Sequence, residues 1–365
     1  MHGALPVASR DLSAGVWETQ AGEDSMKRLD EKLAHIRGGG YTRKDFIIAD
    51  AKDSDMGPSL TGAGPRRAAD GRITGYRTRA EFVDQIRAIV RQDIVDIMLV
   101  SASNLERLVE ERLFDDSAVK PAIRANDTTD IWRVRGGSYH AQPSRPFRTA
   151  SLSRAMYDAA MPSPGAPVTG TDLGLYSITF NHDVDADVAS LNAFRDFRAD
   201  CAACGFKYFL EVFNPNIDTK LDPAVLPHYV NDCIVRCLAG VMKADRPQFL
   251  KIAYNGPKAL EELAAYDESL IVGVLGGGAG TTRDTFELLQ QAERYGARLA
   301  LFGRKINLAE SPLAIVSLMR HVADGAISPT EAVKAYHGEL QKHKLRPERS
   351  LHDDLEITEA PLKAG

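Results

Sequence analysis

The sequence predicts an α/β protein folded as a (β/α)8 TIM barrel, and three observations support that prediction. Eight short β-rich runs recur along the chain. Each of them is followed by a segment that carries a helical pattern, which is the order of a (β/α)8 barrel. Nothing after the first run resembles a dinucleotide-binding glycine turn, which disfavours the alternative, a doubly wound open sheet.

The individual elements follow from hydrophobic periodicity. The expected strands are residues 46–52, 96–102, 121–126, 175–181, 207–213, 249–255, 270–276 and 298–303. The expected helices between and after them are residues 79–92, 104–114, 187–205, 224–244, 257–267, 282–296 and 311–325.

The flanking segments divide the 365 residues into three parts. Residues 1–22 are polar and irregular and are expected to form a flexible arm. Residues 23–338 form one barrel domain that opens with an amphipathic helix stopped by the glycines at 38–40. Residues 339–365 are charged and are expected to form a surface extension.

Two segments are longer than a barrel loop requires, residues 57–78 after the first strand and residues 127–172 after the third. Long ordered loops usually serve as lids or interfaces. Both follow the carboxyl ends of strands, the face that carries active sites in this architecture. We therefore expect both segments to close over a site.

Composition narrows the partners and the location. The net charge of −5 argues against nucleic acid and against an anionic membrane surface. No apolar run approaches the roughly 18 residues of a membrane span, and the first residues lack the apolar core of a secretory signal. A cytoplasmic protein with no cofactor is the expectation.

One lysine stands within an otherwise apolar strand. The stretch FLKIAYNGP places Lys251 in the sixth expected strand. Burial disfavours the charged amine, and a neutral lysine amine is a nucleophile that forms a Schiff base with a ketone or aldehyde. The sequence therefore nominates Lys251 as a catalytic nucleophile.

Further polar residues alternate along the strands. Outward barrel residues pack on helices, so polar strand residues are expected to face the lumen. This places the following side chains in the lumen: Asp50, Lys52, Arg124, Asn126, Ser177, Thr179, Asn181, Glu211, Lys251 and Asn255. Because a lumen is ordinarily apolar, the set indicates a site. The alternative is a structural network of Lys251, Glu211 and Asp50.

The end of the barrel carries glycine-rich turns after its last two strands. LGGGAGTTRDTF holds Gly276, Gly277 and Gly278, and FGRKI holds Gly303 and Arg304. Barrels frequently bind phosphate with these two loops, through backbone N–H groups and a helix N-terminus. The first turn is not a P-loop, because no Gly-Lys-Ser/Thr follows.

Metal sites are weaker predictions. The carboxylates near the first strand and the pair His182–Asp183 would allow a magnesium site, but Asp53 and Asp55 are interpreted as solvated loop or capping carboxylates. No histidine pair has the spacing of a zinc aldolase, and His140 has no evident partner. The cysteines at 201, 204, 233 and 237 are interpreted as core packing in preference to a four-thiolate zinc site. No metal is expected.

Three stretches of the sequence together resemble the class I Schiff-base aldolases of the DhnA and archaeal fructose-bisphosphate aldolase type, within the DeoC-like barrels. They are FIIADAKDSDMGP, LKIAYNG and GGGAGTTRDTFELLQQAERYGARLALFGRKI. The resemblance covers roughly residues 25–325. It implies that Lys251 forms the Schiff base, that Asp50 supports proton transfer and that the two glycine loops bind a substrate phosphate. It also implies a homo-oligomer.

One departure from the family concerns the proton-transferring acid. The family carries a tyrosine near the end of the fifth strand, where this sequence has Asn214. An amide cannot act as a general acid, so Glu211, Tyr254, a lid residue or water would have to serve. The substrate is therefore expected to be a phosphorylated keto sugar or related ketone other than fructose bisphosphate.

Three functions stay open from the sequence. The first is an aldolase in which Lys52, Arg124, Asn126 and Asn181 orient substrate groups. The second is a phosphate-binding isomerase or epimerase with Glu211 and Asp50 as bases. The third is a non-catalytic barrel that binds a sugar phosphate.

Overall fold

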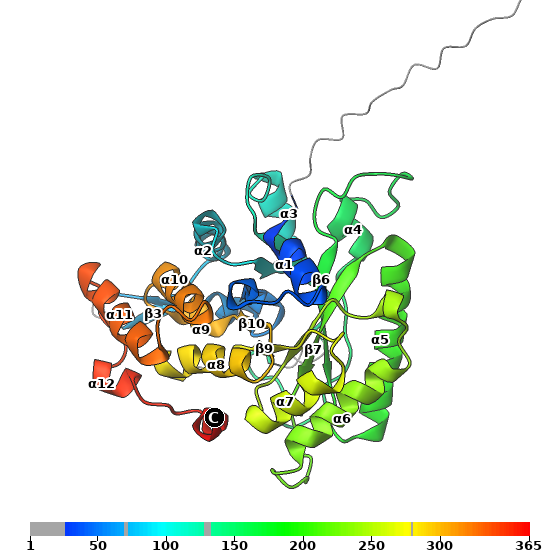
Figure 1. Ribbon diagram of the computed structural model, residues 1–365. Coiled ribbons are helices and arrows are strands. Elements are labelled where there is room, and N and C mark those ends of the chain that lie inside the picture. The colour runs from blue at the N-terminus through cyan, green and yellow to red at the C-terminus, as the bar shows by residue number, and fades with distance from the viewer. Residues whose placement is uncertain (1–25, 69–71, 128–132, 279) are drawn as a thin grey trace, which may run out of the picture.

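The computed structural model describes residues 26–68, 72–127, 133–278 and 280–365. Eight parallel strands close into a barrel in the order β1-β10-β9-β8-β7-β6-β5-β4, with helices around it (Figure 1). They are β1 (Ile47–Lys52), β4 (Ile97–Val100), β5 (Lys120–Arg124), β6 (Leu173–Thr179), β7 (Lys207–Phe213), β8 (Leu250–Ile252), β9 (Gly273–Leu275) and β10 (Leu299–Phe302). The predicted (β/α)8 barrel is confirmed, and each expected strand overlaps an observed one.

The helix expected before the barrel and the seven helices expected from periodicity each overlap an observed helix. The described chain holds α1 (Arg28–Arg37), α2 (Arg79–Gln92), α3 (Ala102–Glu110), α4 (Leu152–Tyr157), α5 (Val184–Cys204), α6 (Leu226–Ala239), α7 (Pro257–Tyr266), α8 (Thr282–Arg294), α9 (Arg304–Leu308), α10 (Pro312–Ala323), α11 (Pro329–Lys342) and α12 (Leu351–Asp354). Of these, α4, α9, α11 and α12 were not predicted. Local capping explains the sharpest boundary. The Thr78 hydroxyl accepts from the Glu81 N–H, the Glu81 carboxylate accepts in return, and α2 begins between them at Arg79.

Helix α1 closes the amino-terminal end of the barrel. Leu29 and Leu33 are buried among the lowest lumen side chains, and Lys32 forms an ion pair of 2.9 Å with the buried Asp96. The helix ends at Gly38, as the glycine run predicted. Since this end is plugged, a substrate can approach only from the opposite, carboxyl end of the strands.

The lumen is apolar toward the amino-terminal ends of the strands and polar toward their carboxyl ends. We call these two parts the lower and the upper lumen. One buried apolar cluster lines the inside of the barrel: Ile47, Ala49, Ala51, Ile97, Leu99, Ala122, Leu173, Leu175, Phe209, Phe249, Ile271, Leu299 and Leu301. A second cluster, which includes Ile48, Met98, Val100 and Phe302, packs with the surrounding helices. These two clusters define which face of each strand is the inner one.

The two long segments differ in role. Residues 57–78 contain the 3-10 turn η3 (Ser59–Ala63) and a hairpin of β2 (Pro65–Arg67) and β3 (Ile73–Tyr76). This segment is fastened to α9, where Asn307 Nδ2 donates to the Gly62 carbonyl over 2.9 Å. In residues 127–172, α4 and the chain after it run along the outside of the barrel to the amino-terminal end of β5. There, Thr171 Oγ1 donates to the Pro121 carbonyl. Only the part before α4 therefore remains at the carboxyl end.

The carboxyl-terminal segment packs against α8. Its last turn, η5 (Ala360–Ala364), buries Leu362 and accepts a hydrogen bond of 2.8 Å from Gln291 Nε2 on α8. Figure 1 shows the carboxyl terminus beside that helix. The expected division at residue 339 falls inside α11, which runs continuously across it. The segment that was expected to be a surface extension thus contributes to the packing around α8.

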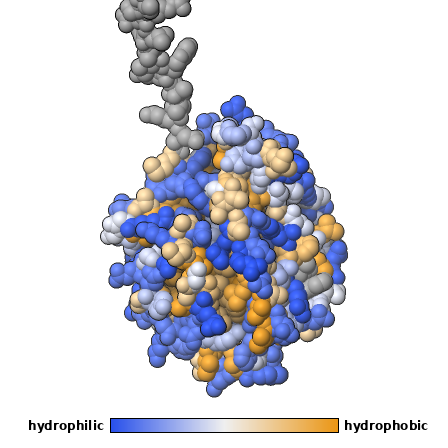
Figure 2. Space-filling view, turned by 90° about the vertical axis from the view of Figure 1, so that its right-hand side faces the viewer, coloured by the Kyte–Doolittle hydropathy of each residue, from blue (hydrophilic) through white to orange (hydrophobic). Residues whose placement is uncertain are grey.

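Apolar side chains reach the molecular surface in separated patches. The face that carries α5 shows them interspersed with hydrophilic residues (Figure 2). Val184 and Val188 on α5 are among the exposed ones. Among the helices described here, none combines the length and apolarity that crossing a membrane would require.

Candidate active site

Lys251 lies in the polar upper lumen and is paired with a carboxylate. Its Nζ is 2.6 Å from Oε1 of Glu211, and the two residues are register neighbours on β8 and β7. Both side chains are almost fully buried, at 6% and 2% exposure. The sequence predicted a lysine between apolar walls, but the structure also gives it a carboxylate partner at hydrogen-bond distance.

The other Glu211 oxygen belongs to a wider network. Oε2 accepts from Ser177 Oγ over 2.6 Å and lies 3.5 Å from Nη1 of Arg124. Arg124 Nη2 donates to the same serine oxygen over 3.0 Å. The carboxylate therefore bridges a lysine and an arginine from opposite sides, and β5, β6, β7 and β8 each contribute one side chain to the network.

Asn126 fixes the edge of this network. Its Nδ2 donates to the Ser177 carbonyl over 2.8 Å, and its Oδ1 accepts from the Ser177 N–H over 2.6 Å. These two bonds continue the pairing of β5 and β6 beyond the end of β5. Asn126 is thus a positioning residue, held by backbone contacts behind the charged groups.

The predicted orientation of Asp50 and Lys52 is wrong. Asp50 is the register partner of Met98 and Phe302, and Lys52 that of Val100, all members of the outer cluster. Both side chains are buried on the helix side of β1, where Lys52 Nζ lies 2.9 Å from each carboxylate oxygen of Asp50. Burial raises the pKa of Asp50. The sequence argument failed because a lysine and a carboxylate that form an ion pair with each other can be buried together outside the lumen.

Asp53 takes the place expected for Asp50. Alternation from Ala49 through Ala51 leads to Asp53 on the inner face, and its Oδ2 accepts from Arg124 Nη1 over 2.8 Å. It is buried, so the expectation of a solvated carboxylate is wrong. The signal was in the sequence, since two small residues precede it at a spacing of two.

Asp55 is exposed, as expected for a loop carboxylate, but it has two side-chain partners. Its Oδ2 accepts from Ser101 Oγ over 2.6 Å and from Asn104 Nδ2 over 3.1 Å. Asp55 therefore ties the turn after β1 to the start of α3.

After β7, where the resemblance implied a tyrosine, Asn214 pairs with an amide that follows β8. Asn214 and Asn255 exchange two side-chain hydrogen bonds of 2.8 and 2.9 Å. Tyr254 points the other way, because its hydroxyl donates to Gln291 Oε1 on α8 over 2.7 Å. Tyr254 is therefore not the proton-transferring acid. Of the candidates considered from the sequence, Glu211 remains next to the lysine.

Asn181 and Asn216 hold residues 139–144 at the carboxyl end of the barrel. Asn216 is buried, and its N–H donates to Asn181 Oδ1 over 3.1 Å. Its side chain accepts from the Ser144 N–H over 3.0 Å and donates to the Gln142 and Tyr139 carbonyls. Asn181 was predicted to contact substrate, and in the structure its Oδ1 accepts from the Asn216 N–H. Asn216 was missed, because contacts to distant backbone leave no local pattern in a sequence.

The two glycine loops meet at the barrel's carboxyl end. Gly276 approaches β10 so closely that a Cβ atom would lie 2.5 Å from the Phe302 ring, and Gly277 has a φ of +64°. Arg304 Nη2 donates to the Gly277 carbonyl over 3.1 Å, so the structure brings the predicted phosphate residues of both loops together. A Cβ atom on Gly303 would be 3.0 Å from the Ala51 carbonyl oxygen, so that turn also lies close to β1.

The first N–H groups of α8 are already satisfied by carboxylates of the chain itself. Thr281 N–H donates to Asp284 Oδ2 and Thr282 N–H to Asp354 Oδ1, each over 2.8 Å. The expected contribution of this helix N-terminus to phosphate binding is therefore replaced by intramolecular capping.

The cysteines and histidines do not assemble a metal site. Burial raises the pKa of the Cys201 and Cys237 thiols to about 12, which disfavours the thiolate that zinc requires. Asp183 caps α5 by accepting from the Ala186 N–H over 2.9 Å. Over the described ranges, no three His, Cys, Asp or Glu side chains gather as metal ligands would.

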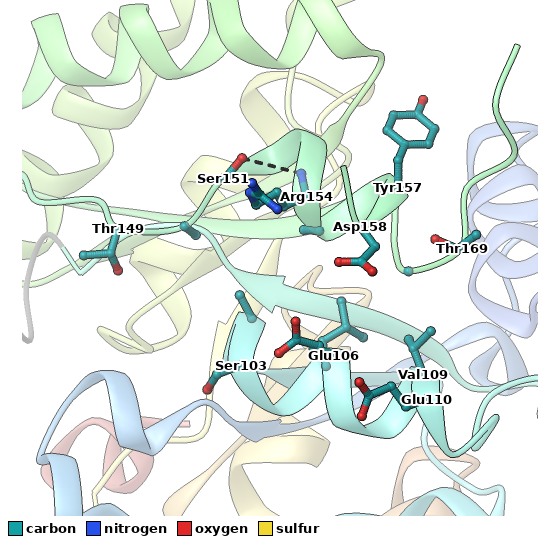
Figure 3. A pocket seen from close by; sticks show the side chains of 15 residues that line it. Ser103, Glu106, Val109, Glu110, Thr149, Ser151, Arg154, Tyr157, Asp158 and Thr169 are labelled. Carbon is teal, nitrogen blue, oxygen red and sulfur yellow. Dashed lines mark hydrogen bonds between the residues drawn. The ribbon is translucent and has the colours of Figure 1, made fainter. Parts of the chain in front are cut away.

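A cavity also lies outside the barrel. A pocket of about 620 Å³ opens between α3 and α4 on the outside of the barrel, and Figure 3 shows Glu106, Glu110 and Asp158 on its walls. None of the predicted catalytic or substrate-binding residues lines it. We place the candidate active site at the polar upper lumen because the ionisable groups converge there, and convergence of such groups, not cavity size, defines a chemical site.

Comparison with known proteins agrees with this architecture. No protein-family model and no curated protein sequence matches the chain. A Schiff base-forming fructose-1,6-bisphosphate aldolase has a similar structure, with a TM-score of 0.56 and 14% identity, over 81% of this chain and 99% of that one. The chain has the fold of that aldolase.

Two further structures are similar. One is an archaeal fructose-1,6-bisphosphate aldolase whose catalytic Lys is covalently bound to the carbinolamine intermediate of its substrate, with a TM-score of 0.55 and 15% identity, over 81% of this chain and 100% of that one. The other is a fructose-bisphosphate aldolase from Slackia heliotrinireducens, with a TM-score of 0.58 and 12% identity, over 92% and 97%. At such identities the likeness establishes the barrel fold.

Proposed function

We propose that this protein is a class I aldolase that cleaves or forms a phosphorylated keto sugar or related ketone through a Schiff base on Lys251. The observation that carries the proposal is the contact of 2.6 Å between Lys251 Nζ and Glu211 Oε1 at the open end of the barrel. A lysine nucleophile needs an adjacent base, and this pair supplies both groups. The similar solved structures, which act through a catalytic lysine, support the same chemistry.

The mechanism begins with a proton transfer. Glu211 accepts a proton from the Lys251 ammonium, and the free amine attacks the substrate carbonyl to form a carbinolamine. The protonated Glu211 then returns its proton to the carbinolamine hydroxyl, which leaves as water and yields the protonated imine. No other oxygen acid described here lies as close to the lysine, so Glu211 serves in both directions.

Bond cleavage uses the imine as an electron sink. A substrate hydroxyl on the fragment that will leave loses its proton, and the carbon–carbon bond breaks. The electron pair of that bond moves into the imine, which becomes an enamine. Protonation of the enamine and addition of water release the second product and restore the lysine. Glu211 is again the group placed to exchange these protons, and Asp53 is the second inner carboxylate, 2.8 Å from Arg124.

The charged network prepares the site for polar substrate groups. Arg124 contacts both Glu211 and Asp53, so it holds the two carboxylates apart at a fixed separation. The amides of Asn214 and Asn255 face each other above the lysine strand and would exchange their mutual bonds for bonds to substrate hydroxyls. Gly276, Gly277, Gly278, Gly303 and Arg304 remain the proposed phosphate end. A homo-oligomer and a cytoplasmic location are further proposals from the family resemblance.

The outward orientation of Asp50 weakens the isomerase alternative, which paired that residue with Glu211 as a second base. An isomerase would have to use Asp53. The two functions differ in whether a covalent adduct forms at the lysine.

Borohydride trapping tests the proposal. The protein is incubated with a panel of ketose phosphates, reduced, digested and mapped by mass spectrometry. We expect a reduced adduct on Lys251 and none in Lys251→Met. Lys52 is the matched internal control, because it is equally buried but lies outside the lumen. An adduct on Lys52 alone, or turnover by Lys251→Met, would refute the mechanism.

A further inference from the structure

A carboxylate of the carboxyl-terminal segment sits against the proposed phosphate loop. A Cβ atom would lie 3.0 Å from Glu359 Oε2 at Gly277, 3.5 Å from Oε1 at Gly278 and 3.1 Å from Oε1 at Gly280. We name these three residues the glycine cradle. Glu359 is therefore the carboxylate nearest to Gly277 and Gly278, while at Gly280 the Asp284 Oδ2 atom lies closer, 2.2 Å from such a Cβ atom.

The carboxylate is held there by several anchors. Thr358 N–H and Glu359 N–H donate to Asp284 Oδ1 over 2.8 and 3.2 Å, and Thr281 Oγ1 donates to the Glu356 carbonyl over 2.6 Å. Burial alone would raise the pKa of Asp284, but hydrogen bonds from Thr358, Thr281 and Glu359 outweigh it and lower that pKa. The anchoring carboxylate is therefore ionised, and the segment is fixed from below.

The surroundings explain how a carboxylate is tolerated at this position. Lys305 is buried beside α8, where its Nζ donates to the Thr281 carbonyl over 3.3 Å, and it interacts electrostatically with Glu359. Arg304 reaches the Gly277 carbonyl from the neighbouring loop. The cradle is thus bordered by two cations and occupied by one of the chain's own anions.

We propose that Glu359 is a specificity-determining residue, whose carboxylate occupies the glycine cradle and competes with a substrate phosphate for it. The inference rests on the proposed function in that it assigns the cradle to the phosphate end. A phosphate carries nearly two negative charges at neutral pH, so a carboxylate at contact distance weakens its binding. Removal of that charge should make the cradle a better anion site.

The test compares two single-charge substitutions in the full chain. Inorganic phosphate is titrated by calorimetry, at low ionic strength and again in 0.5 M salt, chosen as about ten times the ionic strength of the first buffer. In Glu359→Gln we expect phosphate to bind about tenfold more tightly than in the wild type at low salt, with a smaller gain at high salt. Glu356→Gln is the matched control, because it removes the same charge from an exposed side chain three residues earlier.

Two additional variants localise the effect and guard against misfolding. Glu359→Asp keeps the charge and should bind phosphate as weakly as the wild type. Adding Arg304→Gln to Glu359→Gln should abolish the gain if the phosphate sits between the two loops. Equal affinities in wild type, Glu359→Gln and Glu356→Gln, or no binding by any of them, would overturn the proposal.

The outcome is separable from that of the Schiff-base experiment. Tighter phosphate binding by Glu359→Gln together with no Lys251 adduct would support the role of Glu359 and refute the aldolase. A Lys251 adduct together with unchanged phosphate affinity would do the reverse.

Discussion

Replacement of Glu211 by Gln is the most informative perturbation of the candidate site. The substitution preserves the shape of the side chain but removes the charge that faces Lys251 at 2.6 Å and Arg124 at 3.5 Å. General acid–base catalysis by a positioned side chain contributes about 10²–10⁴-fold to a rate. Because Glu211 is the carboxylate next to the lysine, we expect imine formation to slow by a factor in that range.

The same substitution should change stability. Breaking a buried ion pair by removing one partner costs about 3–5 kcal/mol. Arg124 keeps Asp53 as a partner and Gln can still accept from Ser177, so the expected loss lies at the lower end of that range, about 3 kcal/mol. Unfolding in urea, followed by circular dichroism, measures this loss and shows whether the variant is folded at the assay temperature.

The assay is single-turnover borohydride trapping at saturating ketone, followed across pH. In the wild type, Glu211 removes the lysine proton within the site. In Glu211→Gln the proton must go to solvent, so the trapping rate should rise with pH through the range in which lysine amines deprotonate. A folded Glu211→Gln variant that traps the ketone at the wild-type rate, with the wild-type pH profile, would refute the assignment of Glu211 as the proton acceptor.

Three further perturbations test the rest of the site. Asp53→Asn should lower turnover at least tenfold, about the effect of losing a contact to a reacting group, because Asp53 faces Arg124 in the lumen. Asp50→Asn should mainly lower the unfolding free energy, because Asp50 lies outside the lumen. Kinetics and urea unfolding of both variants distinguish the inner from the outer carboxylate. Asn216→Ala should raise the KM for the ketone severalfold at nearly unchanged imine chemistry, since it releases the segment before α4, and increased proteolysis near residues 139–144 would report the same release; unchanged KM and proteolysis would remove the lid role. Burial lowers the pKa of Lys305 to about 8 from 10.5, so the unfolded chain binds this proton more tightly and the unfolding free energy should rise between pH 8 and 10.5 by as much as about 3 kcal/mol relative to Lys305→Met; parallel pH profiles of the two proteins would contradict the burial effect.

The sequence determined the barrel and four of its inner polar side chains. Periodicity located every strand, and α2 begins and ends where its pattern predicts, because capping and hydrophobic alternation are local properties written in neighbouring residues. Arg124, Ser177, Glu211 and Lys251 were predicted to share the lumen and are joined there by contacts of 2.6 to 3.5 Å. Alternation suffices for residues in the middle of a strand.

The tertiary structure decided between the two alternations that the sequence allowed for β1, and it alone decided what lies at the phosphate end. Polarity predicted Asp50, but the register with β4 and β10 turns that residue outward and brings Asp53 to Arg124. The contact between Glu359 and the glycine cradle joins residues about 80 positions apart, a separation across which no local pattern extends. Strand register and long-range packing depend on the free energy of the whole fold, so neither can be read from one segment of the chain.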